Sequence, residues 1–224
     1  MIPEVPKRWP GETFVLIGGG PSLTQADVEA VHDATYSGPH GLEAHLYKPW
    51  TKLRVVAIND AFKLASWADC LYACDRKWID WHDGVPSFTG PKYSLASSDP
   101  TPRPDWTVLQ NTGTTGLELD PTGLRTGINS GYQAINLAVH LGASRIILLG
   151  YDMGPDGTRD HWFGEHPDGQ PSPYPQMREY FETLVEPLQA IGVTVINCSR
   201  RTALTAFPCV PLEQELARLQ ERAA

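Results

Sequence analysis

Short apolar runs of strand length recur along the chain, and polar or helical segments separate them. The runs cover residues 14–17, 53–58, 70–74, 145–149 and 193–196. Each run is too short for a helix and is continuous rather than alternating, which is typical of strands buried on both faces of a parallel sheet. We therefore expect several parallel strands at the centre of the protein.

Helical patterns lie between these runs and after the last one. We expect one helix to begin after Thr24, which has the spacing of an N-cap with Asp27. Further helices are expected over residues 61–65, 132–142, 177–191 and 211–224. The alternation predicts the α/β class, with a Rossmann-like, mainly parallel sheet flanked by helices. Residues 1–224 are expected to form one nucleotide-binding domain.

A glycine-rich turn follows the first run, with the sequence Gly18-Gly19-Gly20-Pro21-Ser22. Glycines allow a sharp turn and leave no side chain between the backbone and a ligand. The proline suits the start of a helix, because the first N–H groups there have no partner inside the helix. Such a turn predicts a nucleotide phosphate site, and the alternative is a tight turn with no ligand. The pattern is not the GxGxxG of dinucleotide-binding sites.

Polar residues also follow the later runs, where an open parallel sheet has its ligand crevice. Asn59 follows the second run and is a candidate for binding a sugar hydroxyl. Its neighbour Asp60 fits a site role and a helix cap equally well. Asp75 and Asp152 follow the third and fourth runs, and a carboxylate there can bind a hydroxyl or a metal ion.

The start of helix 132–142 carries three more candidate nucleotide-binding residues, Asn129, Ser130 and Gly131. Either of the first two can cap the helix. Residues 83–126, in contrast, are rich in Pro, Gly, Ser and Thr, and 107–109 is their only convincing strand fragment. A long, weakly patterned stretch in a compact domain predicts an active-site loop or lid.

Composition and charge narrow the classes of partner. The net charge of −8 argues against strong non-specific binding of nucleic acid or an anionic membrane. No run approaches the roughly 20 apolar residues of a membrane helix, and the first residues lack a signal-peptide pattern, so we expect a cytoplasmic protein. The four cysteines lack CxxC spacing and are expected to be free thiols. Lys77, Arg200 and Arg201 are candidate phosphate partners.

Three sequence blocks resemble the bacterial sialyltransferases of glycosyltransferase family 42 and related phage and archaeal proteins. The blocks are GGGPSL at 18–23, GINSGYQAINLAVHLGASRIILLGYD at 127–152 and VTVINCSRRTALTAF at 193–207. A fourth segment, His161-Trp162-Phe163-Gly164, is similar to the one that carries the family's catalytic histidine. The likeness covers scattered pieces of about two-thirds of the chain.

The resemblance implies a nucleotide-sugar donor, in that family a cytidine monophosphate sugar, and inversion without a metal or other cofactor. By position, residues 18–22 would hold the donor phosphate, Asn59 its ribose or sugar, and Ser130 and Gly131 the nucleotide. His161 would be the general base, since a neutral imidazole can take a hydroxyl proton. The chain departs from the family in three ways: Gly19 replaces an asparagine, leaving-group tyrosines are not evident after the 127–152 block, and a basic tail is absent.

Two other functions stay open. Archaeal pterin diphosphokinase-like proteins share the glycine turn and sheet, and such an enzyme would need Mg²⁺ held by aspartates such as Asp75 and Asp152. Their DxDG-like cluster is missing after Leu71. A non-catalytic nucleotide-binding module is the third alternative. Asp160, His161 and His166 have poor spacing for a metal site, so we assign no metal ligand. The acceptor and the oligomeric state, with a homo-oligomer among the options, stay open as well.

Overall fold

The computed structural model describes residues 3–35, 53–96, 105–157, 159–164 and 172–223. Residues 37–49, whose glycines and prolines without periodicity predict a loop or short insertion, lie outside the described residues, as does His166.

Eight strands of the described chain form one sheet in which every neighbouring pair is parallel. The strands are β1 (Thr13–Ile17), β2 (Leu53–Ile58), β3 (Cys70–Tyr72), β4 (Lys92–Leu95), β5 (Trp106–Asn111), β6 (Gly123–Leu124), β7 (Arg145–Leu149) and β8 (Thr194–Asn197). Their order across the sheet is β6-β5-β4-β3-β2-β1-β7-β8. The expected α/β fold with a Rossmann-like parallel sheet is therefore confirmed.

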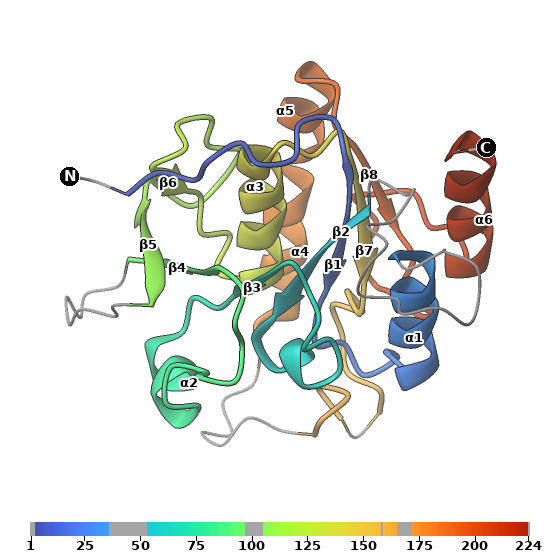
Figure 1. Ribbon diagram of the computed structural model, residues 1–224, viewed down its shortest axis with the longest axis horizontal. Coiled ribbons are helices and arrows are strands. Elements are labelled where there is room, and N and C mark those ends of the chain that lie inside the picture. The colour runs from blue at the N-terminus through green and yellow to red at the C-terminus, as the bar shows by residue number, and fades with distance from the viewer. Residues whose placement is uncertain (1–2, 36–52, 97–104, 158, 165–171, 224) are drawn as a thin grey trace.

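Helices cover both faces of the sheet (Figure 1). They are α1 (Gln25–Thr35), the 3-10 helix η2 (Asn59–Lys63), α2 (Arg76–Trp81), α3 (Ser130–Leu141), α4 (Tyr174–Glu182), α5 (Val185–Ala190) and α6 (Leu212–Ala223). Apolar residues of α3, α4 and α5 pack on one face, and those of α1 and α6 on the other. Successive strand residues point to opposite faces, so Phe14 and Leu16 join the first core and Val15 and Ile17 the second. Two cores explain why the strands read as unbroken apolar runs.

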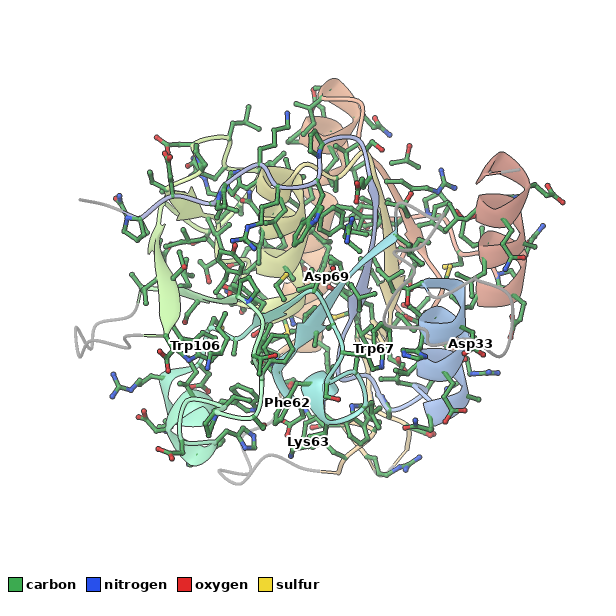
Figure 2. All side chains as sticks on the ribbon, in the orientation of Figure 1. Asp33, Phe62, Lys63, Trp67, Asp69 and Trp106 are labelled. Atoms are coloured by element: carbon green, nitrogen blue, oxygen red, sulfur yellow. The ribbon has the colours of Figure 1, made fainter. Side chains whose placement is uncertain are left out.

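The chain changes direction across the sheet at β1. The strands β2 to β6 are added in sequence on one side of β1, whereas β7 pairs with β1 on the other side. Open parallel sheets bind ligands outside the carboxyl ends of their strands, at such a reversal of strand order. These ends lie toward the bottom of Figure 1, where the side chains of Phe62 and Lys63 are labelled in Figure 2.

Residues 83–126 hold more regular structure than expected, because β4, β5 and β6 extend the sheet there. The expectation of a single strand fragment is wrong, and a buried lysine explains the error. Lys92, in β4, is buried and its Nζ donates to the carbonyl oxygens of Gly84 and Val85, both at 3.1 Å. A buried lysine whose ammonium group donates to local carbonyls interrupts the apolar pattern of β4 without interrupting the strand.

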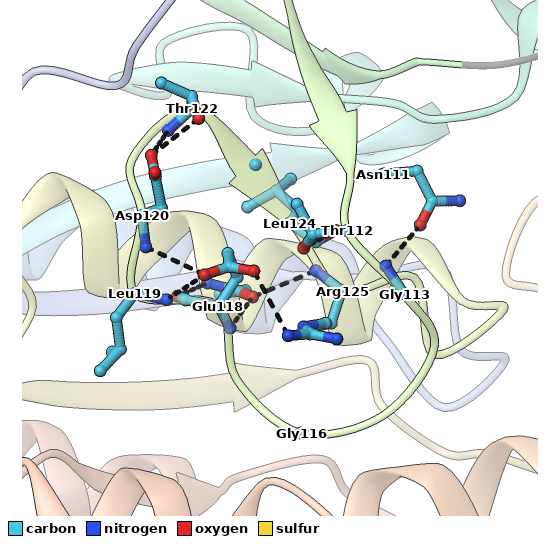
Figure 3. A network of polar contacts seen from close by, with 12 residues as sticks. Asn111, Thr112, Gly113, Gly116, Glu118, Leu119, Asp120, Thr122, Leu124 and Arg125 are labelled. Atoms are coloured by element: carbon cyan, nitrogen blue, oxygen red, sulfur yellow. Dashed lines mark hydrogen bonds and ion pairs between the residues drawn. The ribbon is translucent and has the colours of Figure 1, made fainter.

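Polar contacts fix the loop that follows β5 (Figure 3). Glu118 accepts the N–H groups of Leu119 at 3.0 Å and Asp120 at 3.1 Å, and its second oxygen lies 3.4 Å from Arg125 Nη2. Asn136 of α3 accepts the N–H of Glu118 at 2.9 Å. The described part of the expected lid is thus folded against α3, and none of its residues lines the pocket described below.

Helix boundaries differ from the prediction at two places. The helix expected over 177–191 is divided into α4 and α5. Pro187 explains the division, because it has no N–H to bond the carbonyl of Thr183 and its ring would collide with that carbonyl. The helix expected over 61–65 is the 3-10 helix η2, which starts two residues earlier.

The predicted cap of α1 is confirmed. Thr24 Oγ1 donates to Asp27 Oδ2 at 2.7 Å and accepts the N–H of Asp27 at 3.2 Å. Arg200 holds the same carboxylate through both oxygens, with Nη2 at 2.7 Å and Nε at 2.9 and 3.0 Å. Burial raises the pKa of Asp27, but the bonds from Arg200 and Thr24 outweigh it and lower the pKa overall. The loop after β8 is therefore tied to the start of α1.

The cysteines are free thiols, as the sequence predicts. The four cysteines are free, with Cys70 and Cys198 buried, and burial raises the pKa of Cys198 to about 12. Within the described residues, no helix is both long enough and apolar enough to cross a membrane.

Candidate functional site

A pocket of about 260 Å³ lies at the carboxyl ends of the central strands. The turns after β1, β2, β3 and β7 form its walls, together with the first turn of α3, the segment around His161 and the start of α4. The predicted site residues that line it are Gly18, Gly19, Gly20, Pro21, Asn59, Asp75, Asn129, Ser130, Gly131, Asp152 and His161. The candidates that lie outside the lining are Ser22, Asp60, Lys77, Arg200 and Arg201. The fold thus brings candidates from distant parts of the sequence into one cavity.

The backbone of the glycine turn is bonded to the turn after β7. The N–H of Gly18 donates to the carbonyl of Leu149, the last residue of β7, and the N–H of Gly20 donates to the carbonyl of Gly150, both at 2.8 Å. The N–H of Ser22 donates to Asp152 Oδ2 at 2.9 Å. The expectation that the turn presents unpaired N–H groups is wrong for these three residues. Within the described chain, the N–H of Gly19 makes no hydrogen bond.

Close approach between the two turns explains two of the glycines. A Cβ on Gly18 would lie 2.8 Å from the carbonyl oxygen of Gly150. A Cβ on Gly20 would lie 2.6 Å from the same oxygen and 2.1 Å from Asp152 Oδ1. Neither glycine has a positive φ, so space rather than backbone conformation requires it. A Cβ on Gly19 would instead lie 3.3 Å from His161 Nδ1.

Asp152 is the buried carboxylate of the pocket. It is 4% exposed, and its Oδ1 has no hydrogen-bond partner within the described residues. Burial raises the pKa of Asp152, and the bonds from Ser22 offset part of that rise. An unmet buried acceptor costs free energy, so Oδ1 is an acceptor that a donor group of a ligand could satisfy.

The first turn of α3 offers backbone N–H groups to the pocket. Asn129 caps the helix, because its Oδ1 accepts the N–H of Tyr132 at 3.1 Å. Ser130 and Gly131 are the first two helical residues, whose N–H groups have no partner inside the helix. A Cβ on Gly131 would lie 2.7 Å from the ring of Tyr151, so the third residue of the NSG motif must be a glycine.

Asn59 joins the second strand end to this helix start. Its Nδ2 lies 3.4 Å from Ser130 Oγ, and Cys74 Sγ lies 3.2 Å from the same oxygen. Asn59 has a φ of 49°, and its Oδ1 is buried without a partner in the described chain. The backbone conformation and the side-chain position of Asn59 therefore both belong to the geometry of the pocket wall.

Asp60 turns away from the pocket. It accepts the indole N–H of Trp78 at 2.6 Å and forms an ion pair with Lys63. Burial raises the pKa of this carboxyl, but these bonds outweigh it and lower the pKa overall. Of the two roles considered, neither fits: Asp60 is a structural anchor between η2 and α2.

Asp75 is both a pocket residue and a helix cap. It lines the pocket, and it caps α2 by accepting the N–H of Lys77 at 2.9 Å. Because only one of its oxygens is used in this bond, the other can face a ligand.

His161 lies over the glycine turn. Its ring is stacked on that of Phe163, with centroids 4.9 Å apart and planes at 8°. The next residue, Trp162, donates its N–H to the carbonyl of Gly19 at 3.1 Å. Tyr174 Oη donates to the carbonyl of Asp160 at 3.2 Å and so ties the segment to α4. The histidine is therefore positioned by main-chain and ring contacts at the pocket wall.

The pocket is acidic. Its described lining includes the carboxylates Asp75, Asp152 and Asp160 and no lysine or arginine. The candidate phosphate partners from the sequence are elsewhere: Arg200 is paired with Asp27, Arg201 Nη2 lies 2.7 Å from Asp156 Oδ1, and Lys77 does not line the pocket. Among the described lining residues, backbone N–H groups and His161 are therefore the groups that can meet a negative charge on a ligand, and a cation that arrives with the ligand is the alternative.

Sequence reasoning missed the apolar members of the wall. They are Ile58, Trp78, Ile128, Met153, Phe163 and Met177, and Tyr151 and Tyr174 were also missed. A position next to a predicted polar residue of the pocket in the sequence identifies four of them, Ile58, Ile128, Tyr151 and Met153. Residues of α4 carry no such signal.

Comparison with known proteins gives no relative: no family model, no curated protein and no solved structure matches this chain. Among the described residues, no group of three or more His, Cys, Asp or Glu side chains is arranged to hold a metal ion.

Replacing Gly20 with alanine tests the close approach of the two turns. We expect Gly20→Ala to lower the free energy of unfolding by about 1–3 kcal/mol, because its Cβ would overlap fixed oxygen atoms. Urea denaturation measures the change. Gly154→Ala is the matched control, since the nearest atom to its Cβ is 3.9 Å away, and a loss below about 0.5 kcal/mol is expected there. Equal losses for the two variants would contradict the packing argument.

Replacing Asp152 with asparagine tests the buried carboxylate. Asparagine keeps an acceptor for the Ser22 N–H but carries no charge. Because the pKa of Asp152 is raised by folding, its ionised form weakens the fold at neutral pH, and that penalty shrinks as the pH falls through the folded pKa. Asp152→Asn should thus be as stable as the parent or more stable at pH 7, with an advantage that fades in acid. Thermal unfolding from pH 7 to 4 measures it, and an advantage that grows in acid would refute the assignment.

Proposed function

We propose that the protein is a transferase that uses a nucleotide-sugar donor, with His161 as general base and inversion at the sugar carbon. The observation that carries the proposal is the meeting of His161, the glycine turn and the first turn of α3 in one pocket at the switch point of a parallel sheet. A cytidine monophosphate sugar is the first donor to test, because the sequence resemblance implies it.

The phosphate of the donor is assigned to the start of α3 rather than to the glycine turn. The N–H groups of Ser130 and Gly131 are available there, whereas those of Gly18, Gly20 and Ser22 already have acceptors. A helix N-terminus favours an anion through these N–H groups and the helix dipole. The Gly19 N–H can add one further donor.

The hydroxyl groups of the donor are assigned to Asn59 and Asp152, whose buried oxygens have no partner in the described chain. His161 takes the proton from an acceptor hydroxyl as its oxygen attacks the sugar carbon. The bond from that carbon to the phosphate oxygen breaks, and the nucleotide leaves with the electron pair. The proton ends on the imidazole, so the step needs no cofactor.

One observation favours a second candidate, a magnesium-dependent diphosphokinase. The described pocket lining carries three aspartates and no basic side chain, which suits a nucleoside triphosphate that brings Mg²⁺. In that reaction the diphosphate passes to an acceptor hydroxyl and a nucleoside monophosphate leaves.

Replacing His161 tests its proposed role as general base. We expect His161→Ala to lower turnover about a hundredfold to ten-thousandfold, the usual contribution of a general base. Donor affinity, measured by calorimetry, should change less than about fivefold, or 1 kcal/mol, because His161 addresses the acceptor. His32→Ala is the control, since His32 belongs to α1 and does not line the pocket.

The same assays in EDTA assign the reaction class. Binding and transfer that persist in EDTA support the glycosyltransferase. Activity that requires Mg²⁺ and is lost in Asp152→Asn moves the protein to diphosphate transfer. Nucleotide binding without turnover of any donor, in parent and variants alike, identifies a binding module.

A further inference from the structure

Ile128 combines an unfavourable backbone with an exposed apolar side chain. Its φ is 49°, its side chain is 39% exposed, and it lines the pocket. A β-branched residue in this left-handed region is a rare outlier, and glycine would occupy it without steric cost. The turn alone therefore gives no reason for an isoleucine.

Hydrogen bonds from both sides hold this conformation. Thr126 donates its N–H to the carbonyl of Gly113 at 2.8 Å, and its own carbonyl accepts Gln133 Nε2 at 2.7 Å. The N–H of Ile128 donates to Thr126 Oγ1 at 3.2 Å. Gln133 is itself fixed by Tyr72, whose hydroxyl donates to it at 2.6 Å. Strained residues that their surroundings over-determine in this way cluster at ligand sites.

Met177 extends the apolar surface. It lines the pocket from α4, and its sulfur lies 3.4 Å from Nδ2 of Asn129, the residue after Ile128. Ser130 and Gly131, whose N–H groups are assigned to the phosphate, come next in the sequence. An apolar wall and an anion site are thus neighbours at the start of α3.

We propose that Ile128 and Met177 form an apolar subsite that binds the nucleobase of the ligand. The inference rests on the proposed function, in which the ligand is a nucleotide or a nucleotide-sugar. In such a ligand the phosphate, the ribose and the transferred sugar are covered with polar groups. The faces of the base are the part that gains from leaving water against aliphatic side chains.

Truncating Ile128 tests the subsite. Parent, Ile128→Ala and Ile191→Ala are titrated calorimetrically with cytidine, uridine, adenosine and guanosine monophosphates. Ile191 is the matched control, because it is 40% exposed and does not line the pocket. We expect Ile128→Ala to weaken the tightest-binding monophosphate about fivefold to tenfold and Ile191→Ala to leave it unchanged. Competition by ribose 5-phosphate, which has no base, should be the same in all three proteins.

A glycine variant separates contact from folding. Glycine accepts the backbone of residue 128, so Ile128→Gly should unfold at the same temperature as the parent or higher and still lose nucleotide affinity. Unchanged affinity in both variants overturns the subsite and leaves the proposed function standing. An equal loss of affinity for ribose 5-phosphate also overturns the subsite. The substitution would then act on the phosphate site at the start of α3 rather than on contact with the base. A parent protein that binds none of the four monophosphates overturns the proposed function and the subsite together.

Discussion

The turn after β1 and the turn after β7 approach so closely that there is no space for a side chain on Gly18 or Gly20. Hydrogen bonds from Gly18, Gly20 and Ser22 join the two turns, and the carbonyl of Gly150 fills the space that a Cβ would need. Everything at the pocket depends on this junction, because it fixes Asp152 under the glycine turn and leaves Gly19 to face His161. Gly18 and Gly20 therefore serve the packing of the two turns.

Several residues of the pocket wall have a backbone conformation or an environment that costs free energy, and the rest of the fold must offset that cost. Asn59, Ile128 and Met153 have positive φ values and all line the pocket, and such residues cost about 1–3 kcal/mol each. The raised pKa and unmet oxygen of Asp152 add to this. Two buried cores support these residues. Three of the five non-glycine residues with positive φ in the described chain thus line one cavity, and the other two, Asp83 and Val85, follow α2.

Local patterns predicted the parts of the fold that depend on near neighbours. The unbroken apolar runs identified β1, β2, β7 and β8 because both faces of each strand are buried. The sequence did not predict β4, because the buried Lys92, which donates hydrogen bonds to nearby carbonyls, interrupts the apolar pattern. It did not predict β6, because that strand has only two residues. Pocket membership of the strand-end residues was also predictable, since parallel strands end at the same edge.

The state of the glycine turn was not predictable, because its acceptors come from residues far along the chain. Ser22 donates to Asp152, and the two are separated by 130 positions. The residues GGGPS alone do not show that the N–H groups of this turn already donate to acceptors elsewhere in the chain. The same holds for Met177, which lines the pocket from α4 and contacts Asn129, 48 positions earlier in the chain.

Hydrogen–deuterium exchange with and without a saturating nucleotide tests the central claim, that this pocket is the ligand site, most directly. The account predicts slower exchange in peptides covering the turn after β1, the start of α3 and the turn after β7, with no change in α5 or α6. Protection confined to α5 and α6, or no protection by any nucleotide that binds, would contradict it.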